Sequence, residues 1–347
     1  HLSIRRQRQM CIRDSNATYP SIHEFGGEVG WQHTTVDEEG NLNLSFDNAD
    51  WEKINEEWGV SGIYFTGGAY STFECPSRCR AVVNASRIGS FLINGRLYSG
   101  DPYGHNLIQT PVILDEGVNH VFFMIGGFGG GDSVHFEILP PPDTDLVILE
   151  RDIMVGDIIR GEEYNTWTGV PVLNTTERWI GGITLNGSAY EYQIPPLSVV
   201  KISSHLIMEV PPEEIEEADT FDIPIHLAWE GGSLESFGTA RVRDPEDSRL
   251  VTFQSRNDYS TQKYGIRFPL NYDPQNTYAL ILTTHGAGVE CQGQVDAFDS
   301  KDWAFVVAPT NRRRFGFDWQ DWGRLDAIEI LDRIMDEYPI CLLYTSP

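Results

Sequence analysis

The residues best suited to take part in a reaction lie directly after an apolar stretch. They form the run Thr284-His285-Gly286-Ala287-Gly288-Val289-Glu290. A His-Gly-x-Gly turn at the end of a strand brings bare backbone N–H groups to the edge of a sheet. Glycine permits both the tight turn and the close approach of a ligand oxygen. In acyl transfer, an oxyanion needs donors at this place, and one donor is worth about 2.7 to 4 kcal/mol in the transition state. An ordinary strand-to-helix connection is the alternative reading.

The segments around this turn predict an α/β domain over residues 246–340. Short strands are expected at 250–255 and 263–270, before two continuously apolar runs at 278–284 and 303–308. Such runs are typical of parallel strands that helices cover on both faces. A helix should follow, with Asp318 as its N-cap. Its apolar residues recur every three or four positions: Trp322, Leu325, Ile328, Leu331 and Met335.

This part of the chain resembles the N-terminal half of the catalytic domain in prolyl oligopeptidase-like α/β-hydrolases, which are serine hydrolases. The resemblance covers about 90 residues and rests on HGAGVE (285–290), APTNRR (308–313) and DWQDWGRLDA (318–327). It implies that the catalytic contribution of this chain is the oxyanion turn His285, Gly286, Ala287 and Gly288. Gly286 and Ala287 would donate through their backbone N–H groups, and His285 would shape the turn.

The family also implies a Gly-x-Ser-x-Gly nucleophile turn, an Asp and a His, and none of these is found. Ser133 and Ser233 each have a glycine two positions before them, but both lack the second glycine of the motif. We therefore expect the parent protein to be a serine hydrolase without cofactor or metal, acting on peptides or on esters such as those of decorated polysaccharides. This chain alone, as a truncated half of the hydrolase sheet, should be inactive.

Two β-rich blocks precede the turn, at residues 16–142 and 143–245. In the first, Asn94-Gly95 between apolar flanks predicts a two-residue hairpin, because both central residues need a positive φ. This hairpin, followed by PVILDEGVNHVFF (111–123), resembles a galactose-binding-type jelly roll. A glycan site near Tyr98, Tyr103 and Asp101 is therefore expected there. The second block has the strand spacing of an immunoglobulin-like sandwich.

The rival hypothesis is a non-catalytic carbohydrate-binding or adhesion protein, in which the two sandwiches are the functional part. The glycine cluster 126–131 does not support nucleotide binding, because no Lys-Ser/Thr pair follows it. Trp319 and Trp322 are expected in the core instead of a substrate cleft. A solvated acidic face is expected on the last helix, from Asp321, Asp326, Glu329 and Asp332.

The composition excludes other classes of partner. The sequence has 51 acidic and 25 basic residues, a net charge of -26. This balance repels phosphate backbones and makes nucleic acid an unsuitable partner. No run of about 18 apolar residues is present, so no membrane-spanning helix is expected.

The ends and the cysteines complete the expectations. Residues 1–15 and 341–347 resemble translated sequencing adapter and are excluded from fold reasoning. Cys75 and Cys79 either form a local disulfide or stay ordinary thiols; a metal site would need further ligands that the neighbouring sequence lacks. A disulfide would indicate an extracellular or cell-surface protein.

Overall fold

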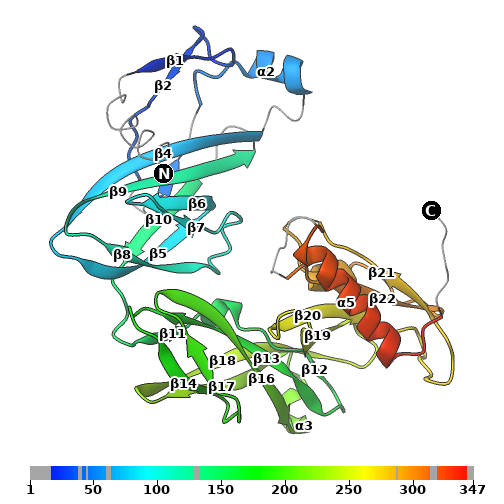
Figure 1. Ribbon diagram of the computed structural model, residues 1–347. Coiled ribbons are helices and arrows are strands. Elements are labelled where there is room, and N and C mark those ends of the chain that lie inside the picture. Colours follow the sequence, from blue (N-terminus) through cyan, green and yellow to red (C-terminus); the bar gives the residue numbers. More distant parts are fainter. Residues whose placement is uncertain are drawn as a thin grey trace. The chain divides into compact units, whose positions relative to one another are not determined.

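The computed structural model describes residues 17–37, 41–43, 46–59, 64–128, 133–286, 288–312 and 319–341. The adapter-like leader therefore lies outside the described residues, as does the tail beyond Cys341 and the predicted N-cap Asp318. The chain divides into two compact units, residues 1–144 and 145–347. Each unit is built mainly of β-strands (Figure 1).

The first unit is an antiparallel β-sandwich, as predicted for the first β-rich block. Two four-stranded sheets face one another (Figure 1), with strand orders β4-β9-β6-β7 and β3-β10-β5-β8. Buried side chains from both sheets, such as Phe91, Val112 and Val121, meet in one apolar core. The strands are β3 (Asn41–Asn43), β4 (Tyr64–Cys75), β5 (Cys79–Ser86), β6 (Ile88–Ile93), β7 (Arg96–Ser99), β8 (Gln109–Leu114), β9 (Gly117–Phe128) and β10 (Ser133–Leu139).

Local features of this unit agree with the sequence in part. Asn94 (φ 46°) and Gly95 (φ 75°) form the expected hairpin turn between β6 and β7. The sequence did not indicate the helix α2 (Trp51–Trp58), which begins at Asp50; its side chain accepts from the N–H of Lys53. A small hairpin, β1 (Thr18–Pro20) with β2 (Glu28–Gly30), stands before it. The first block is thus a β-sandwich with a helical insertion.

The second unit begins with another sandwich. A three-stranded sheet, β11-β13-β16, packs on a five-stranded sheet, β12-β18-β17-β14-β15. Their shared core is apolar and includes Val170, Ile183, Ile202 and Leu227, all fully buried. The strands are β11 (Leu146–Ile148), β12 (Ile158–Ile159), β13 (Tyr164–Asn174), β14 (Ile180–Leu185), β15 (Tyr192–Ile194), β16 (Ser198–Met208), β17 (Thr220–Trp229) and β18 (Gly232–Arg243), with the short helices η2 (Glu150–Asp152) and α3 (Pro212–Ile215).

A mixed four-stranded sheet follows in the same unit, with the order β19-β20-β22-β21. β20 (Thr261–Arg267) pairs antiparallel with β19 (Arg249–Gln254) on one side and with β22 (Ala304–Pro309) on the other. β21 (Ala279–Leu282) runs parallel to β22, as expected from the two apolar runs. β22 is buried throughout, but β21 is only half-buried, so the prediction that both runs are covered on both faces holds for β22 alone.

Helices cover both faces of this sheet. The short helix α4 (Cys291–Asp296), which the sequence did not indicate, packs Cys291 and Val295 against Val306 and Ala308. The long helix α5 (Trp322–Glu337) lies on the other face, against Phe305 and Val307 (Figure 1). Strand β22 therefore stands in the middle layer of an α/β arrangement. Its assignment to the hydrolase family stays a prediction.

The orientation of α5 corrects the predicted helix face. The residues expected to face the core are exposed or only half-buried: Trp322, Leu325, Ile328, Leu331 and Met335. The helix instead buries Gly323, Asp326, Ile330 and Ile334. It carries apolar residues on two sides, and a glycine with a buried carboxylate marks the side that approaches the sheet. Apolar spacing alone could not choose between them.

No helix within the described ranges is long and apolar enough to cross a membrane.

Candidate functional site

The His-Gly-x-Gly turn lies where the parallel strands β21 and β22 end. Beyond Leu282, the N–H of Thr283 donates to the carbonyl of Val307 at 2.8 Å, which extends the pairing to the start of the turn. Thr310 and Asn311 follow β22 at the same edge. The turn thus occupies the carboxyl edge of the sheet, which is the usual place of ligand sites in open α/β sheets.

His285 is buried, with 3% of its surface exposed, and its ring is held from three sides. Nδ1 lies 3.0 Å from the carbonyl oxygen of Gly286, and Nε2 lies 3.2 Å from that of Thr310. The indole of Trp319 stands edge-on to the ring and donates from Nε1 to the carbonyl of His285 at 3.0 Å. Both ring nitrogens therefore face main-chain carbonyls, and the ring links the turn to the strand end beside it.

The glycines of the turn face open space. A Cβ atom placed on Gly286 or Gly288 would meet no atom within 4 Å, and both residues are exposed. Gly288 has φ +76°, which L side chains rarely adopt, so glycine is needed there for the backbone. The N–H of Val289 donates to the carbonyl of Gly286 at 3.3 Å and closes the turn. Ala287, the other predicted donor, lies outside the described residues.

A buried ion pair fixes the far end of the turn. Glu290 precedes α4 as its N-cap, and its Oε2 accepts from Nζ of Lys263 at 2.6 Å. The side chain of Lys263 is only 4% exposed, and that of Glu290 is 20% exposed. A second contact joins the strand to the helix, because Gln294 Nε2 donates to Thr283 Oγ1 at 2.8 Å. The turn is consequently tied to β20 and α4.

A second buried charge supports the loop after β22. Asp326 on α5 is fully buried, and its Oδ2 accepts from the N–H of Asn311 at 2.8 Å. Asn311 (φ 61°) and Arg312 (φ 59°) both have left-handed backbones, which are costly for residues other than glycine. Burial raises the pKa of Asp326 to about 6, an effect that the nearby Arg312 guanidinium and the Asn311 N–H offset only in part.

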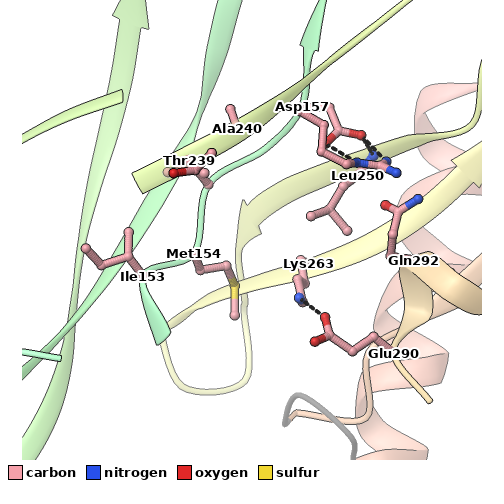
Figure 2. Close-up of a pocket in the computed structure, with 11 residues that line it drawn as sticks. Ile153, Met154, Asp157, Thr239, Ala240, Leu250, Lys263, Glu290 and Gln292 are labelled. Atoms are coloured by element: carbon pink, nitrogen blue, oxygen red, sulfur yellow. Dashed lines mark hydrogen bonds and ion pairs between the residues drawn. The ribbon is translucent and has the colours of Figure 1, made fainter. Parts of the chain in front are cut away.

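A cavity of about 180 Å³ lies near the turn but does not include it (Figure 2). It opens between the second sandwich and the sheet, and Figure 2 shows Lys263 and Glu290 facing one another in its wall. On the opposite side, the buried carboxylate of Asp157 accepts two hydrogen bonds from Arg241, at 3.0 and 2.5 Å, and one from the N–H of Leu250. Among the described residues of the turn, His285, Gly286 and Gly288 do not line this cavity, so we do not assign it as a substrate pocket of the turn.

Two predictions about α5 need correction. Trp322 is 54% exposed and lies under the Arg312 guanidinium, 5.3 Å from the ring centroid, so it is not a core residue. The expected solvated acidic face is not continuous either. Asp326 is buried, and Glu329 accepts hydrogen bonds from Ser255 and Asn257. Helical spacing predicted that these carboxylates share one exposed face. In the structure, Asp326 and Glu329 instead accept hydrogen bonds from loops packed on α5.

The glycan residues expected on the first unit have structural roles in two of three cases. Tyr98 stacks on Phe91 with ring centroids 5.3 Å apart and joins the core. Asp101 is buried and accepts from the N–H groups of Gly104 and Leu107 in its own loop. Tyr103 alone is exposed, and it stacks on His105 at 5.9 Å.

The sequence reading missed the supporting charges Lys263, Glu290, Arg312 and Asp326. A signal existed for the first pair, because Lys263 is one of only four lysines and Glu290 directly follows the turn. Nothing in the sequence distinguishes Asp326 from its exposed neighbours, since its burial depends on how α5 is rotated.

Comparison with known proteins gives no family. No protein-family model matches the chain, and no curated protein matches it. Similar solved structures include a thermostable esterase, 15% identical over 54% of this chain and 68% of its own, with a TM-score of 0.22. The exo-chitosanase CsxA of Amycolatopsis orientalis is 9% identical over 59% of this chain and 28% of its own, with a TM-score of 0.30. A GH2 beta-galacturonidase from Eisenbergiella tayi is 11% identical over 50% of this chain and 35% of its own, with a TM-score of 0.26. At these TM-scores the likenesses carry no argument about fold or activity.

Proposed function

We propose that this chain belongs to a serine hydrolase that works by acyl transfer, and that the turn 285–288 supplies its oxyanion donors. The nucleophile motif is not among these 347 residues. Under this proposal the activity belongs to a longer parent protein, in which these residues carry the oxyanion half of the site. Peptides and esters are both suitable substrates, because the oxyanion forms in the same way during attack on either carbonyl.

The observation that carries the proposal is the open face of the two glycines at the carboxyl edge of the sheet. Free space above Gly286 and Gly288 is what a substrate oxygen needs in order to approach a backbone N–H. Among the described residues, the N–H of Gly286 has no acceptor in the protein. Because Gly286 is exposed, this donor can bind water in the free protein and a substrate oxygen during the reaction.

The supports of the turn favour the same function. Donors stabilise a transition state best when they are fixed before the reaction, because no energy is then spent on reorienting them. His285 holds one end of the turn through the Thr310 and Gly286 carbonyls, and the Lys263–Glu290 pair holds the other. A buried ion pair is a poor device for stability alone. We therefore assign the Lys263–Glu290 pair the role of positioning the turn.

The proposal extends to the place of action. An extracellular or cell-surface enzyme fits the strongly acidic composition and the two sandwiches ahead of the sheet. The first sandwich would hold a glycan through the exposed Tyr103–His105 stack, bringing the hydrolase to polysaccharide-linked substrate. If the turn proves inactive, this stack is the observation that favours the rival function of a non-catalytic carbohydrate-binding protein.

The test uses the natural gene that encodes residues 16–340 and the sequence that follows them, with a matched pair of variants at Ala287. Ala287→Pro removes the backbone N–H, whereas Ala287→Gly keeps it. We expect Ala287→Pro to lower kcat on p-nitrophenyl acetate by about 10² to 10³, the effect of one oxyanion donor. Ala287→Gly should stay within a few-fold of the parent enzyme.

Folding is checked in the same proteins by circular dichroism and thermal unfolding. A folded Ala287→Pro variant with unchanged kcat would refute the oxyanion role. Equal losses in both variants would show that the turn acts through its shape and not through the N–H.

A further inference from the structure

The first sandwich contains a pair of cysteines at a crossing between its two sheets. Cys75 is the last residue of β4, and Cys79 is the first residue of β5. β4 belongs to the sheet β4-β9-β6-β7 and β5 to the sheet β3-β10-β5-β8. The three residues Pro76-Ser77-Arg78 therefore carry the chain from one layer of the sandwich to the other.

The two sulfur atoms lie close together. Cys75 Sγ is 3.1 Å from Cys79 Sγ, and it also lies 3.1 Å from the carbonyl oxygen of Ser77. A disulfide bond is about 2.05 Å long, so the sulfurs need to approach by only about 1 Å. Cys75 is buried and Cys79 is half-buried in the core of the sandwich. The crossing thus holds the two sulfur atoms close to bonding distance.

The surroundings do not suit a metal site or a reactive thiol. Within the described residues, no group of three His, Cys, Asp or Glu side chains could hold a metal ion. Catalytic and redox-sensing cysteines have lowered pKa values, because the thiolate is the reactive form. Here the hydrogen bond shared with Cys75, together with burial, raises the pKa of the Cys79 thiol. A structural role remains for the pair.

A second crossing between the same two sheets is closed by side-chain hydrogen bonds. β8 ends at Leu114 and β9 begins at Gly117, so residues 115–116 also pass between the two sheets. Leu114 pairs with Cys79 and Gly117 pairs with Cys75, which places the two crossings side by side. The fully buried amide of Asn119 closes this second crossing with three hydrogen bonds, to the N–H and carbonyl of Asp115 and the carbonyl of Gly117.

We propose that Cys75 and Cys79 form a disulfide that closes the β4–β5 crossing, as Asn119 closes the β8–β9 crossing. The two thiols lose two protons and two electrons when the S–S bond forms. A second disulfide takes them up and is reduced to two thiols, through a mixed disulfide. The bond would persist in an oxidising compartment, which agrees with an extracellular protein and is independent of the proposed hydrolase activity.

The test is a redox titration of the whole chain against reduced and oxidised glutathione. Free thiols are alkylated at each ratio, and mass spectrometry of the peptide containing residues 75–79 gives the oxidised fraction. The titration is repeated in urea, where the same five-residue spacing remains but the fold is lost. We expect the effective concentration of the two thiols to be at least tenfold higher in the folded chain. By linkage, tenfold corresponds to about 1.4 kcal/mol of stabilisation by the bond.

Controls separate this result from general oxidation. Cys79→Ser should leave Cys75 able to form only a mixed disulfide with glutathione. Cys341, which is exposed, should form only a mixed disulfide with glutathione, in proportion to the oxidised glutathione present, and gives the response of a thiol without a nearby partner. Equal effective concentrations with and without urea would overturn the proposal, as would a folded chain whose pair stays reduced in excess oxidised glutathione.

Discussion

The two halves of the second unit bury different kinds of side chain. The sandwich formed by residues 146–243 has a core of aliphatic residues, with Val170, Ile183 and Leu227 fully buried. The sheet formed by residues 249–341 also has an apolar core, but it buries Lys263, His285 and Asp326 as well. His285 lies on the turn after β21 and contacts Thr310. Lys263 donates to Glu290 at the end of that turn, and Asp326 accepts from Asn311 on the loop after β22.

This difference separates a scaffold from a site. Buried charges contribute little to stability, because their desolvation offsets their attraction. A sequence that only had to fold would have apolar residues at these positions. Their concentration around one sheet edge indicates that the edge must keep a particular backbone geometry. The sandwich also buries one carboxylate, that of Asp157 paired with Arg241, but this pair lies in the cavity wall beside the sheet and outside the aliphatic core.

The largest effect is expected in the sandwich. Leu227→Ala should lower the free energy of unfolding by about 2 to 5 kcal/mol, because it leaves a cavity in a fully buried core. The loss should be the same at pH 5 and pH 8, since that core holds no carboxylate or histidine, and burial raises the pKa of its Tyr164 far above this range. Urea unfolding at the two pH values measures it. A loss that changes with pH would mean that the sandwich is not the plain scaffold described here.

The ion pair at the turn should respond asymmetrically. Glu290→Gln leaves the buried Lys263 ammonium without its carboxylate and should cost about 2 to 3 kcal/mol. Lys263→Met should cost about 1 kcal/mol or less, because the more exposed Glu290 can be hydrated. The double variant should recover most of the loss seen in Glu290→Gln.

Urea unfolding provides the values, and an exposed pair provides the matched control. Asp336→Asn, which removes the partner of Arg256 on the surface of α5, should change stability by less than about 0.5 kcal/mol. If Glu290→Gln behaves like Asp336→Asn, the pair does not act as a buried one and the contrast between the two halves fails.

Asp326 adds a pH dependence to the sheet. Its pKa of about 6 in the folded chain is above the unfolded value near 3.9, so the unfolded chain binds fewer protons between these values. Stability from this group is therefore present at low pH and is lost as the pH rises toward 6. Relative to the wild type, Asp326→Asn should gain about 1 to 3 kcal/mol between pH 4 and pH 7. A difference that stays constant over this range would rule out the titration.

The smallest effect is expected at the exposed stack of the first unit. Tyr103→Ala should change the stability by less than about 0.5 kcal/mol, whereas Tyr98→Ala should cost about 2 kcal/mol or more, because Tyr98 packs on Phe91. A glycan microarray of the wild type and Tyr103→Ala then tests the binding role. Binding that depends on Tyr103 supports it; identical arrays for both proteins exclude this stack as the site.

The sequence predicted strands better than it predicted faces. The sequence identified both blocks as β-rich sandwiches, and Asn94-Gly95 identified its hairpin, because these signals are local. The predicted buried face of α5 was wrong. Trp322 and Ile330 both lie on apolar stripes of this helix, and its packing against the sheet determines which stripe is buried. The helix α4 is too short for its periodicity to be recognised.

The sequence could identify the turn at the centre of the candidate site, but not the charged residues that support it. The glycines at 286 and 288 could be found because backbone geometry restricts the residue type there. Lys263 and Asp326 are distant from the turn in sequence, and charged residues are usually exposed. Their roles follow only from the packing of β20 and α5 against the turn.

The central claim, that the turn 285–288 serves an acyl-transfer enzyme, is tested most directly by a fluorophosphonate probe. The probe is applied to the 347-residue chain and to the product of the extended gene, and the labelled peptide is identified by mass spectrometry. We predict no stoichiometric label on the chain and one labelled serine, within a Gly-x-Ser-x-Gly turn, in the longer protein. A labelled serine within residues 1–347, or a folded longer protein that takes no label, would contradict the account.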